Sequence, residues 1–86
     1  MSYNIVYKKS VQHDLGRLSK AEARRVLGHI ERELAQNPES NPVLKGRFSG
    51  LRKLRIGDYR VIYAVLRTDV LVLRIGNRKN VYRKKT

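Results

Sequence analysis

The chain has 86 residues and lacks cysteine and tryptophan, and it contains only two histidines and seven acidic residues. Without cysteine it can form neither disulfides nor thiolate metal sites, which fits a reducing cytosol. Its acidic residues form no cluster that could hold a metal ion. No apolar run approaches the roughly 20 residues of a membrane span, and the N-terminus does not resemble a secretion signal. We therefore expect a cytoplasmic protein whose chemistry, if any, uses fixed positive charge and phenols.

Positive charge is what this chain has in excess. Twenty Lys and Arg against seven Asp and Glu give a net charge of +13 and a pI near 10.8, which predicts an anionic partner. Residues 1–44 carry seven basic and five acidic side chains, whereas residues 45–86 carry thirteen and two. The C-terminal part should therefore build a basic face. At this length the chain is expected to form one domain over residues 1–86.

The N-terminal half predicts a strand followed by two helices. Alternating apolar residues indicate a strand over 3–7. Ser10 is expected to cap a short helix whose buried face is Val11, Leu15 and Leu18. Ser19 and Glu22 match a capping box that starts a second helix, ended by Asn37-Pro38. The apolar face of this second helix comprises Ala23, Val26, Leu27, Ile30 and Leu34.

The C-terminal half predicts strands at about 51–56, 59–67 and 69–75. Gly57-Asp58 and Thr68-Asp69 supply the turns, and such short connections favour antiparallel hairpins. Gly76 should end the third strand, and Val81-Tyr82 could add a short edge segment. The resulting order, β-α-α-β-β-β, predicts an α+β fold in which a mainly antiparallel sheet packs on an N-terminal helical hairpin. The opposite face of the sheet would carry the charge.

Strand periodicity indicates which cations share a face. Lys53 and Arg55 point away from the face that holds Leu54 and Ile56. Arg60 shares its parity with Ile62, although its place beside a turn allows it to be re-aimed. We hypothesise that Arg78 and Tyr82, from the final loop and edge, approach the 53–60 segment.

Such a cluster suits cleavage of RNA without a metal, because the ribose 2′-OH is the nucleophile. The protein must then stabilise the negative charge that builds up on the phosphate and must transfer protons. Arginine and lysine suit the first task. A tyrosine has a reference pKa of about 10, and surrounding cations would lower it. Tyr82 is therefore a credible general base, since its neighbours in the sequence are Arg78, Lys79, Arg83 and Lys84.

Three segments carry a resemblance to a known family: Leu-Arg-Lys-Leu-Arg-Ile-Gly-Asp-Tyr-Arg-Val-Ile-Tyr at 51–63, Gly-Asn-Arg at 76–78 and Val-Tyr-Arg at 81–83. Together they resemble the RelE branch of the RelE/ParE toxin superfamily, and the likeness covers nearly the whole chain. Residues 57–63 mark the superfamily, and the two later segments favour its nuclease branch. The resemblance implies a type II toxin, neutralised by a RelB-like antitoxin, that cuts mRNA in the ribosomal A site without metal or cofactor.

The resemblance also implies a role for individual residues. Lys53 would stabilise the phosphate charge and Arg60 would contact the scissile phosphate. Arg78 would stabilise the transition state or assist the leaving 5′-oxygen, and Tyr82 would be the base. The residues expected to add RNA affinity are Arg52, Arg55, Lys79, Arg83 and Lys84.

The chain departs from the family pattern at two positions. Leu51 stands where some members have a second lysine, so that role is lost or shifts to Arg55. Asn77 stands where many have histidine, which excludes histidine chemistry at that position and gives more weight to Tyr82.

Other functions fit the same residues. One is a ParE-like inhibitor of DNA gyrase that cuts no RNA, and another is a noncatalytic RNA- or ribosome-binding module. Lys53 and Arg55 could also be the solvated face of an ordinary strand. Tyr59 and Tyr63 are expected in the core or an interface rather than as base-stacking platforms. The arginines expected to be exposed on helices are Arg17, Arg24, Arg25 and Arg32.

Overall fold

The computed structural model describes residues 2–46 and 50–77. In chain order its elements are β1 (Asn4–Tyr7), α1 (Lys9–Gly16), α2 (Lys20–Leu34), the 3-10 helix η1 (Pro38–Ser40), β2 (Arg52–Ile56), β3 (Tyr59–Leu66) and β4 (Asp69–Asn77). The expected order of strands and helices is therefore confirmed. The edge segment expected at Val81-Tyr82 lies outside the described residues.

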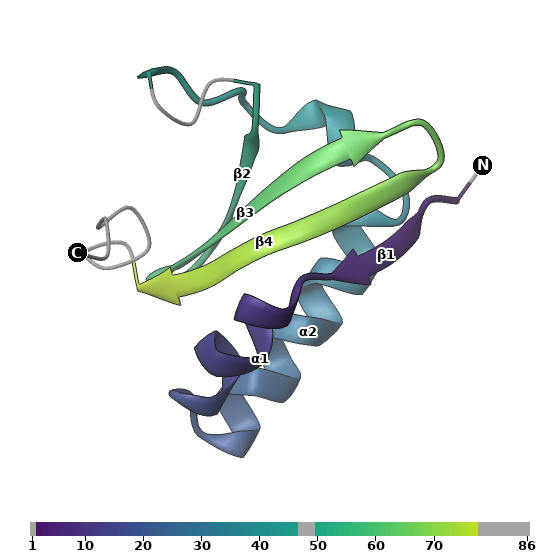
Figure 1. Ribbon diagram of the computed structural model, residues 1–86. Helices are drawn as coiled ribbons and strands as arrows, with labels where there is room; N and C mark the ends of the chain where they lie inside the picture. The colour runs from purple at the N-terminus through teal and green to yellow at the C-terminus, as the bar shows by residue number, and fades with distance from the viewer. Residues whose placement is uncertain (1, 47–49, 78–86) are drawn as a thin grey trace.

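The four strands form one sheet in the order β1-β4-β3-β2. β1 lies parallel to β4, whereas β4 with β3 and β3 with β2 are antiparallel. α1 and α2 form a hairpin on one side of the sheet (Figure 1). The expected α+β architecture is thus correct, with one parallel pair in an otherwise antiparallel sheet.

The core lies between the hairpin and the sheet, and its residues follow the predicted periodicities. The cluster of buried apolar side chains comprises Val11, Val26, Ile30, Leu34, Leu54, Ile56, Val61, Tyr63, Val70, Val72 and Ile75. Ala23 and Leu27 of the predicted α2 face are only partly buried. No helix within residues 2–46 and 50–77 is long and apolar enough to cross a membrane.

The two predicted helix caps had different outcomes. Ser19 caps α2 as expected, because its Oγ accepts the backbone N–H of Glu22 at 3.1 Å. The Glu22 carboxylate does not complete a capping box and instead binds the hydroxyl of Tyr59. The prediction for Ser10 was wrong: α1 starts after Lys8, and the Ser10 hydroxyl donates to the carbonyl of Leu73 at 2.9 Å.

The sequence had suggested that Gly76 ends the last strand, but this prediction was wrong. β4 continues to Asn77, with Gly76 opposite Arg60 and Asn77 opposite Tyr59. The continued pairing with β3 compensates for the weak strand propensity of glycine. β4 also contains an irregularity, since Ile62 pairs with Arg74 but Tyr63 pairs with Val72.

The turn between β3 and β4 places Arg67 in the left-handed region, with φ of 37°. This conformation disfavours side chains with a Cβ, so we expect Arg67→Gly to raise the free energy of unfolding by about 0.5–1 kcal/mol. Chemical denaturation measures the change. Thr68→Gly is the control, because Thr68 lacks a positive φ and glycine should bring no gain there. Equal effects of the two substitutions would contradict this account.

Candidate nucleic-acid interface

A basic cluster of Lys53, Arg55 and Arg60 occupies the sheet face opposite the helices. Arg55 is the direct cross-strand partner of Arg60, and Lys53 is the partner of Ile62. Direct partners in an antiparallel pair have Cβ atoms about 4.5–5.5 Å apart, and diagonal neighbours lie about 7–8 Å apart. The pairing therefore places three cations together, as strand parity had predicted for Lys53 and Arg55.

Arg60 is the fixed member of this cluster. It is only 8% exposed, and its Nη1 donates to the carbonyl oxygens of Gly57 at 3.2 Å and of Tyr59 at 3.1 Å. No carboxylate forms an ion pair with the cluster among the described residues. The guanidinium of Arg60 is thus held in place by two neutral backbone carbonyl groups.

Arg52 does not join the basic cluster. It pairs with Tyr63, on the alternate face of β2, and its Nη1 donates to the carbonyl oxygens of Glu39 at 3.2 Å and of Asn41 at 2.6 Å. Tyr63 supports the same segment by donating to the carbonyl of Pro38 at 2.6 Å. Both side chains therefore fasten residues 38–41 to the sheet, and RNA binding by Arg52 stays a prediction.

The other predicted site residues belong to the last segment of the chain. Arg78, Lys79, Tyr82, Arg83 and Lys84 lie outside the described residues. β4 nevertheless runs alongside Arg60 as far as Asn77, the residue before Arg78. The hypothesis that the last residues approach the basic cluster is compatible with this path and stays a prediction.

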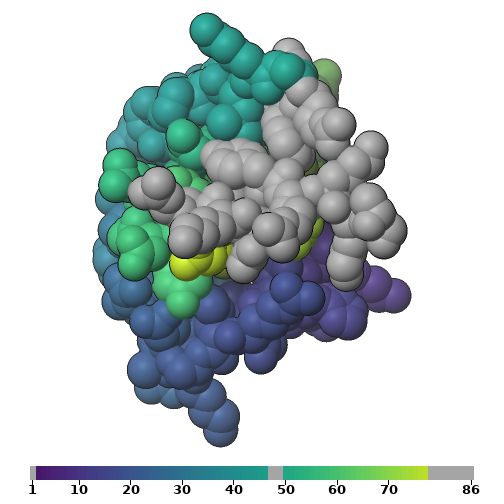
Figure 2. Space-filling model, turned by 90° about the vertical axis from the view of Figure 1, so that its left-hand side faces the viewer, coloured from purple at the N-terminus to yellow at the C-terminus, as the bar shows by residue number. Residues whose placement is uncertain are grey.

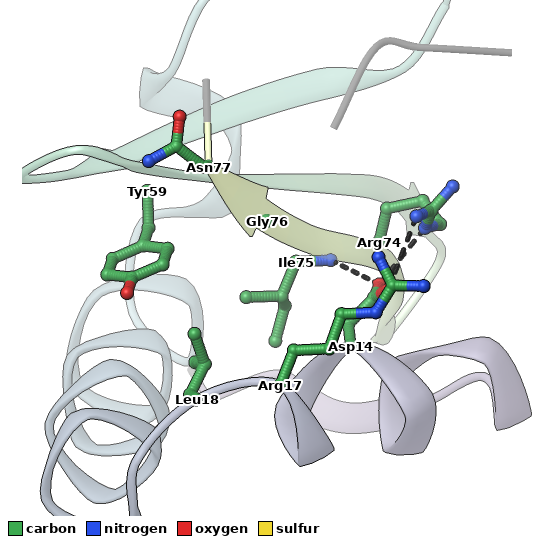
Figure 3. Close-up of a pocket in the computed structure, with 8 residues that line it drawn as sticks. All are labelled: Asp14, Arg17, Leu18, Tyr59, Arg74, Ile75, Gly76 and Asn77. Carbon is green, nitrogen blue, oxygen red and sulfur yellow. Dashed lines mark hydrogen bonds and ion pairs between the residues drawn. The ribbon is translucent and has the colours of Figure 1, made fainter. Parts of the chain in front are cut away.

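A shallow pocket of about 180 Å³ opens between the hairpin and the end of β4 (Figure 3). Its lining comprises Asp14, Arg17, Leu18, Tyr59, Arg74, Ile75, Gly76 and Asn77. Arg17 extends from the end of α1 toward Asp14 and Arg74, whereas the ring of Tyr59 points down from the sheet toward the helices. Arg17 thus brings positive charge to the helix side of the sheet end, whereas the charge of Arg74 is paired with Asp14.

Asp14, which the sequence analysis missed, organises this end of the molecule. It is 7% exposed, and its Oδ2 accepts the backbone N–H of Ile75 at 2.8 Å. The same carboxylate accepts two bonds from Arg74, at 3.0 Å from Nε and 3.2 Å from Nη2. One signal was available, since Asp14 lies three residues after Val11 and interrupts the apolar face of α1.

The phenols of three described tyrosines are engaged in hydrogen bonds. Burial and a 3.0 Å bond to Glu31 raise the pKa of Tyr7. The bond to Glu22 raises the pKa of Tyr59, and burial raises that of Tyr63. These phenols are held neutral, so a phenolate base would have to come from another tyrosine. Within the described part of the chain, no group of three or more His, Asp or Glu residues could hold a metal ion.

Residues 5–82 match the family model for the ParE toxin of the type II toxin–antitoxin system parDE. No curated protein matches the chain by sequence.

Several solved structures are similar over nearly the whole chain. A chain of the RelE–RelB complex from Pyrococcus horikoshii is 33% identical, with 93% of this chain and 99% of that chain covered and a TM-score of 0.65. A chain of the RelBE2 toxin–antitoxin complex from Mycobacterium tuberculosis has a TM-score of 0.81 at 23% identity, covering 91% and 100%. A chain of the intact E. coli RelBE complex has a TM-score of 0.70 at 18% identity, covering 88% and 96%. The last two likenesses establish the fold.

Removing the charge of Asp14 should destabilise the protein. We expect Asp14→Asn to lower the free energy of unfolding by about 1.5–3 kcal/mol, because it removes charged hydrogen bonds to Arg74 and Ile75. Thermal or urea unfolding measures the loss. Asp58→Asn, in an exposed turn where both residues are favourable, is the matched control. A loss for Asp14→Asn no larger than for the control would refute this role.

The raised pKa values of Tyr7 and Tyr59 predict a loss of stability in alkali. The folded protein holds these protons more tightly than the unfolded chain, whose tyrosines titrate near pH 10. The stabilisation is therefore present below about pH 10 and is lost as the pH rises through the folded-state values. Urea unfolding between pH 9 and 11 should show a shallower decline for Tyr7→Phe/Tyr59→Phe than for wild type. Identical slopes would contradict the assignment of this loss to Tyr7 and Tyr59. Tyr3→Phe is the control, because it removes a hydroxyl that forms no hydrogen bond with the described residues.

Proposed function

This chain belongs to the ParE toxin family of type II toxin–antitoxin systems, and from that premise we propose that it is an endoribonuclease that cuts mRNA in the ribosomal A site. The observation that carries the proposal is the direct pairing of Arg55 with Arg60, beside Lys53. Like charges directly opposite in a sheet are destabilising. A phosphate bound between them would remove the repulsion and use both guanidinium groups.

The proposed reaction needs neither metal nor cofactor. The 2′-oxygen bonds to phosphorus and its proton passes to the Tyr82 phenolate, while the bond from phosphorus to the 5′-oxygen breaks. The 5′-oxygen takes a proton from water, and the phosphate remains as a 2′,3′-cyclic phosphate. Arg60, fixed by the carbonyls of Gly57 and Tyr59, grips the scissile phosphate. Lys53, with Arg55 as helper, stabilises the additional charge, and Arg78 assists the leaving oxygen.

An antitoxin is the second partner in this proposal. The solved relative that is 33% identical is a RelE–RelB complex. A protein with a net charge of +13 favours an acidic or amphipathic partner segment, which could cover the basic cluster. With the ribosome and mRNA as targets, the site of action is the cytoplasm.

The alternative is a gyrase inhibitor of the ParE type, and the name of the matching family model favours it. It has no use for the basic cluster as a catalytic site, so neutralising Lys53 and Arg60 should leave toxicity intact. A noncatalytic RNA- or ribosome-binding module would instead retain salt-sensitive binding without cleavage.

The decisive experiment adds antitoxin-free protein to ribosomes programmed with a defined mRNA, with naked mRNA as control, and maps cuts by primer extension. We expect cuts confined to the A-site codon. Arg60→Ala should slow cleavage by about 100-fold or more, because it removes a fixed cation at the phosphate. Tyr82→Phe combined with Arg78→Ala should abolish it. Arg67→Ala, at an exposed arginine at the opposite end of β3, is the matched control and should cut like wild type.

The outcomes separate the candidate functions. Intact mRNA together with inhibited gyrase supercoiling would favour the ParE alternative. Intact mRNA with tight ribosome binding would favour the noncatalytic module. Equal cleavage by Arg60→Ala and Arg67→Ala would remove the basic cluster from the reaction.

A further inference from the structure

The buried carboxylate of Asp14 lies where the last strand loses its neighbour. β4 pairs with β1 only as far as Val72, and in the described part of the chain no strand pairs with the rest of that edge. There the N–H of Ile75 donates to Asp14 at 2.8 Å, and the carbonyl of Leu73 accepts a bond from Ser10 at 2.9 Å. Hydrogen bonds to an ionised group are roughly twice as strong as those between neutral groups. Asp14 therefore makes the stronger of these two contacts from α1 to the strand.

The end of β4 beyond this contact is intrinsically weak. After Ile75, Gly76 and Asn77 pair with β3, and Gly76 lies directly opposite Arg60. Glycine weakens a strand, because it has high backbone entropy and no side chain to pack. A partly buried strand end of this kind opens more readily than the centre of a sheet. The bond from Ile75 to Asp14 thus restrains the strand immediately before its weakest residue.

The position of this strand end bears on the proposed reaction, because the next residue is Arg78. Consecutive Cα atoms are about 3.8 Å apart, so the position of Asn77 restricts where Arg78 can lie. Arg60, which is proposed to grip the scissile phosphate, lies on the neighbouring strand opposite Gly76. A displacement of about 1 Å in a group that acts in a reaction can cost about 100-fold in rate. The proposed reaction therefore requires that Gly76 stays against β3.

The other partner of Asp14 is a cation that starts from the substrate face. Lys53, Ile62 and Arg74 are direct partners across β2, β3 and β4, and direct partners point to the same face of a sheet. The guanidinium of Arg74 nevertheless bonds Asp14 of α1 on the helix side, at 3.0 Å from Nε and 3.2 Å from Nη2 (Figure 3). Asp14 thus withdraws one positive charge from the face that holds the basic cluster.

We propose that Asp14 is a positioning residue of the nuclease, which holds the end of β4 against β3 so that Arg78 stays beside Arg60. This inference rests on the proposed function. Asp14 is not a catalytic residue, since its carboxylate is buried and bonded to Arg74 and Ile75. Its loss should slow turnover rather than weaken binding, because the basic cluster on β2 and β3 stays in place.

Three variants separate positioning from stability. Asp14→Ala removes the bonds to both partners, whereas Asp14→Asn removes the charge and keeps an oxygen that can accept the N–H of Ile75. Ile30→Ala is the matched control, because it destabilises the core from α2 and removes no bond to the free edge of β4. Cleavage is measured on ribosomes programmed with a defined mRNA, at a temperature where circular dichroism shows every variant to be folded.

We expect Asp14→Ala to lower kcat about tenfold or more, because Arg78 is displaced in the transition state. KM for programmed ribosomes should change less than about threefold, because the basic cluster still binds and Arg74 is released toward it. Asp14→Asn should recover most of the lost kcat despite its lower stability, and Ile30→Ala should cut like wild type. A loss of kcat in Asp14→Asn as large as in Asp14→Ala would refute positioning through Ile75.

Amide hydrogen exchange, followed by NMR, tests the same inference without cleavage. Asp14→Ala should accelerate exchange at Gly76 at least about tenfold more than at Val70, where β1 covers β4. Ile30→Ala should accelerate exchange at both amides by the same factor, through global unfolding. Equal acceleration at the two amides in Asp14→Ala would overturn the proposal, even in a protein that cuts mRNA. A wild type that cuts no mRNA would refute the nuclease, and the exchange rates would still decide whether Asp14 holds the end of β4.

Discussion

The position of the helical hairpin against the sheet depends on how the free edge of β4 is satisfied. β1 has four residues and β4 has nine, so β1 ends opposite Val72, and within residues 2–46 and 50–77 no strand pairs with the rest of β4 on that side. α1 takes its place, with Ser10 bonding the carbonyl of Leu73 and Asp14 the N–H of Ile75. Because buried backbone groups must be paired, these bonds fix where α1 lies. They also bring the hairpin tip to the end of the sheet that carries Arg60.

The basic cluster follows from short-range rules and could be predicted in large part. A two-residue turn at Gly57-Asp58 requires Ile56 to face Tyr59, and the next pair is then Arg55 with Arg60. The period of two along each strand places Lys53 on the same face. Periodicity could not predict that Arg60 is buried, nor that it donates hydrogen bonds to the carbonyls of Gly57 and Tyr59.

The sequence analysis did not predict how Ser10 and Asp14 satisfy the free edge of β4, because their partners lie far away in the sequence. Asp14 and Arg74 are sixty positions apart, and their contact exists only because β1 pairs in parallel with β4. Local patterns contain no information about such a pairing. Ser10 was misassigned for the same reason, since a serine before a helical stretch resembles a cap until its distant partner, Leu73, is known. Gly76 was misread because its local preference was weighed without the strand beside it.

The distribution of charge indicates which parts of the structure support stability and which serve binding. Neutral or paired contacts hold the frame: the apolar core, the tyrosine bonds to Glu22 and Glu31, and the Asp14–Arg74 pair. The cations of the basic cluster lie outside this frame, on the sheet face opposite the helices. Repulsion between Arg55 and Arg60 lowers stability, so their pairing is not explained by folding. A bound polyanion would relieve this repulsion.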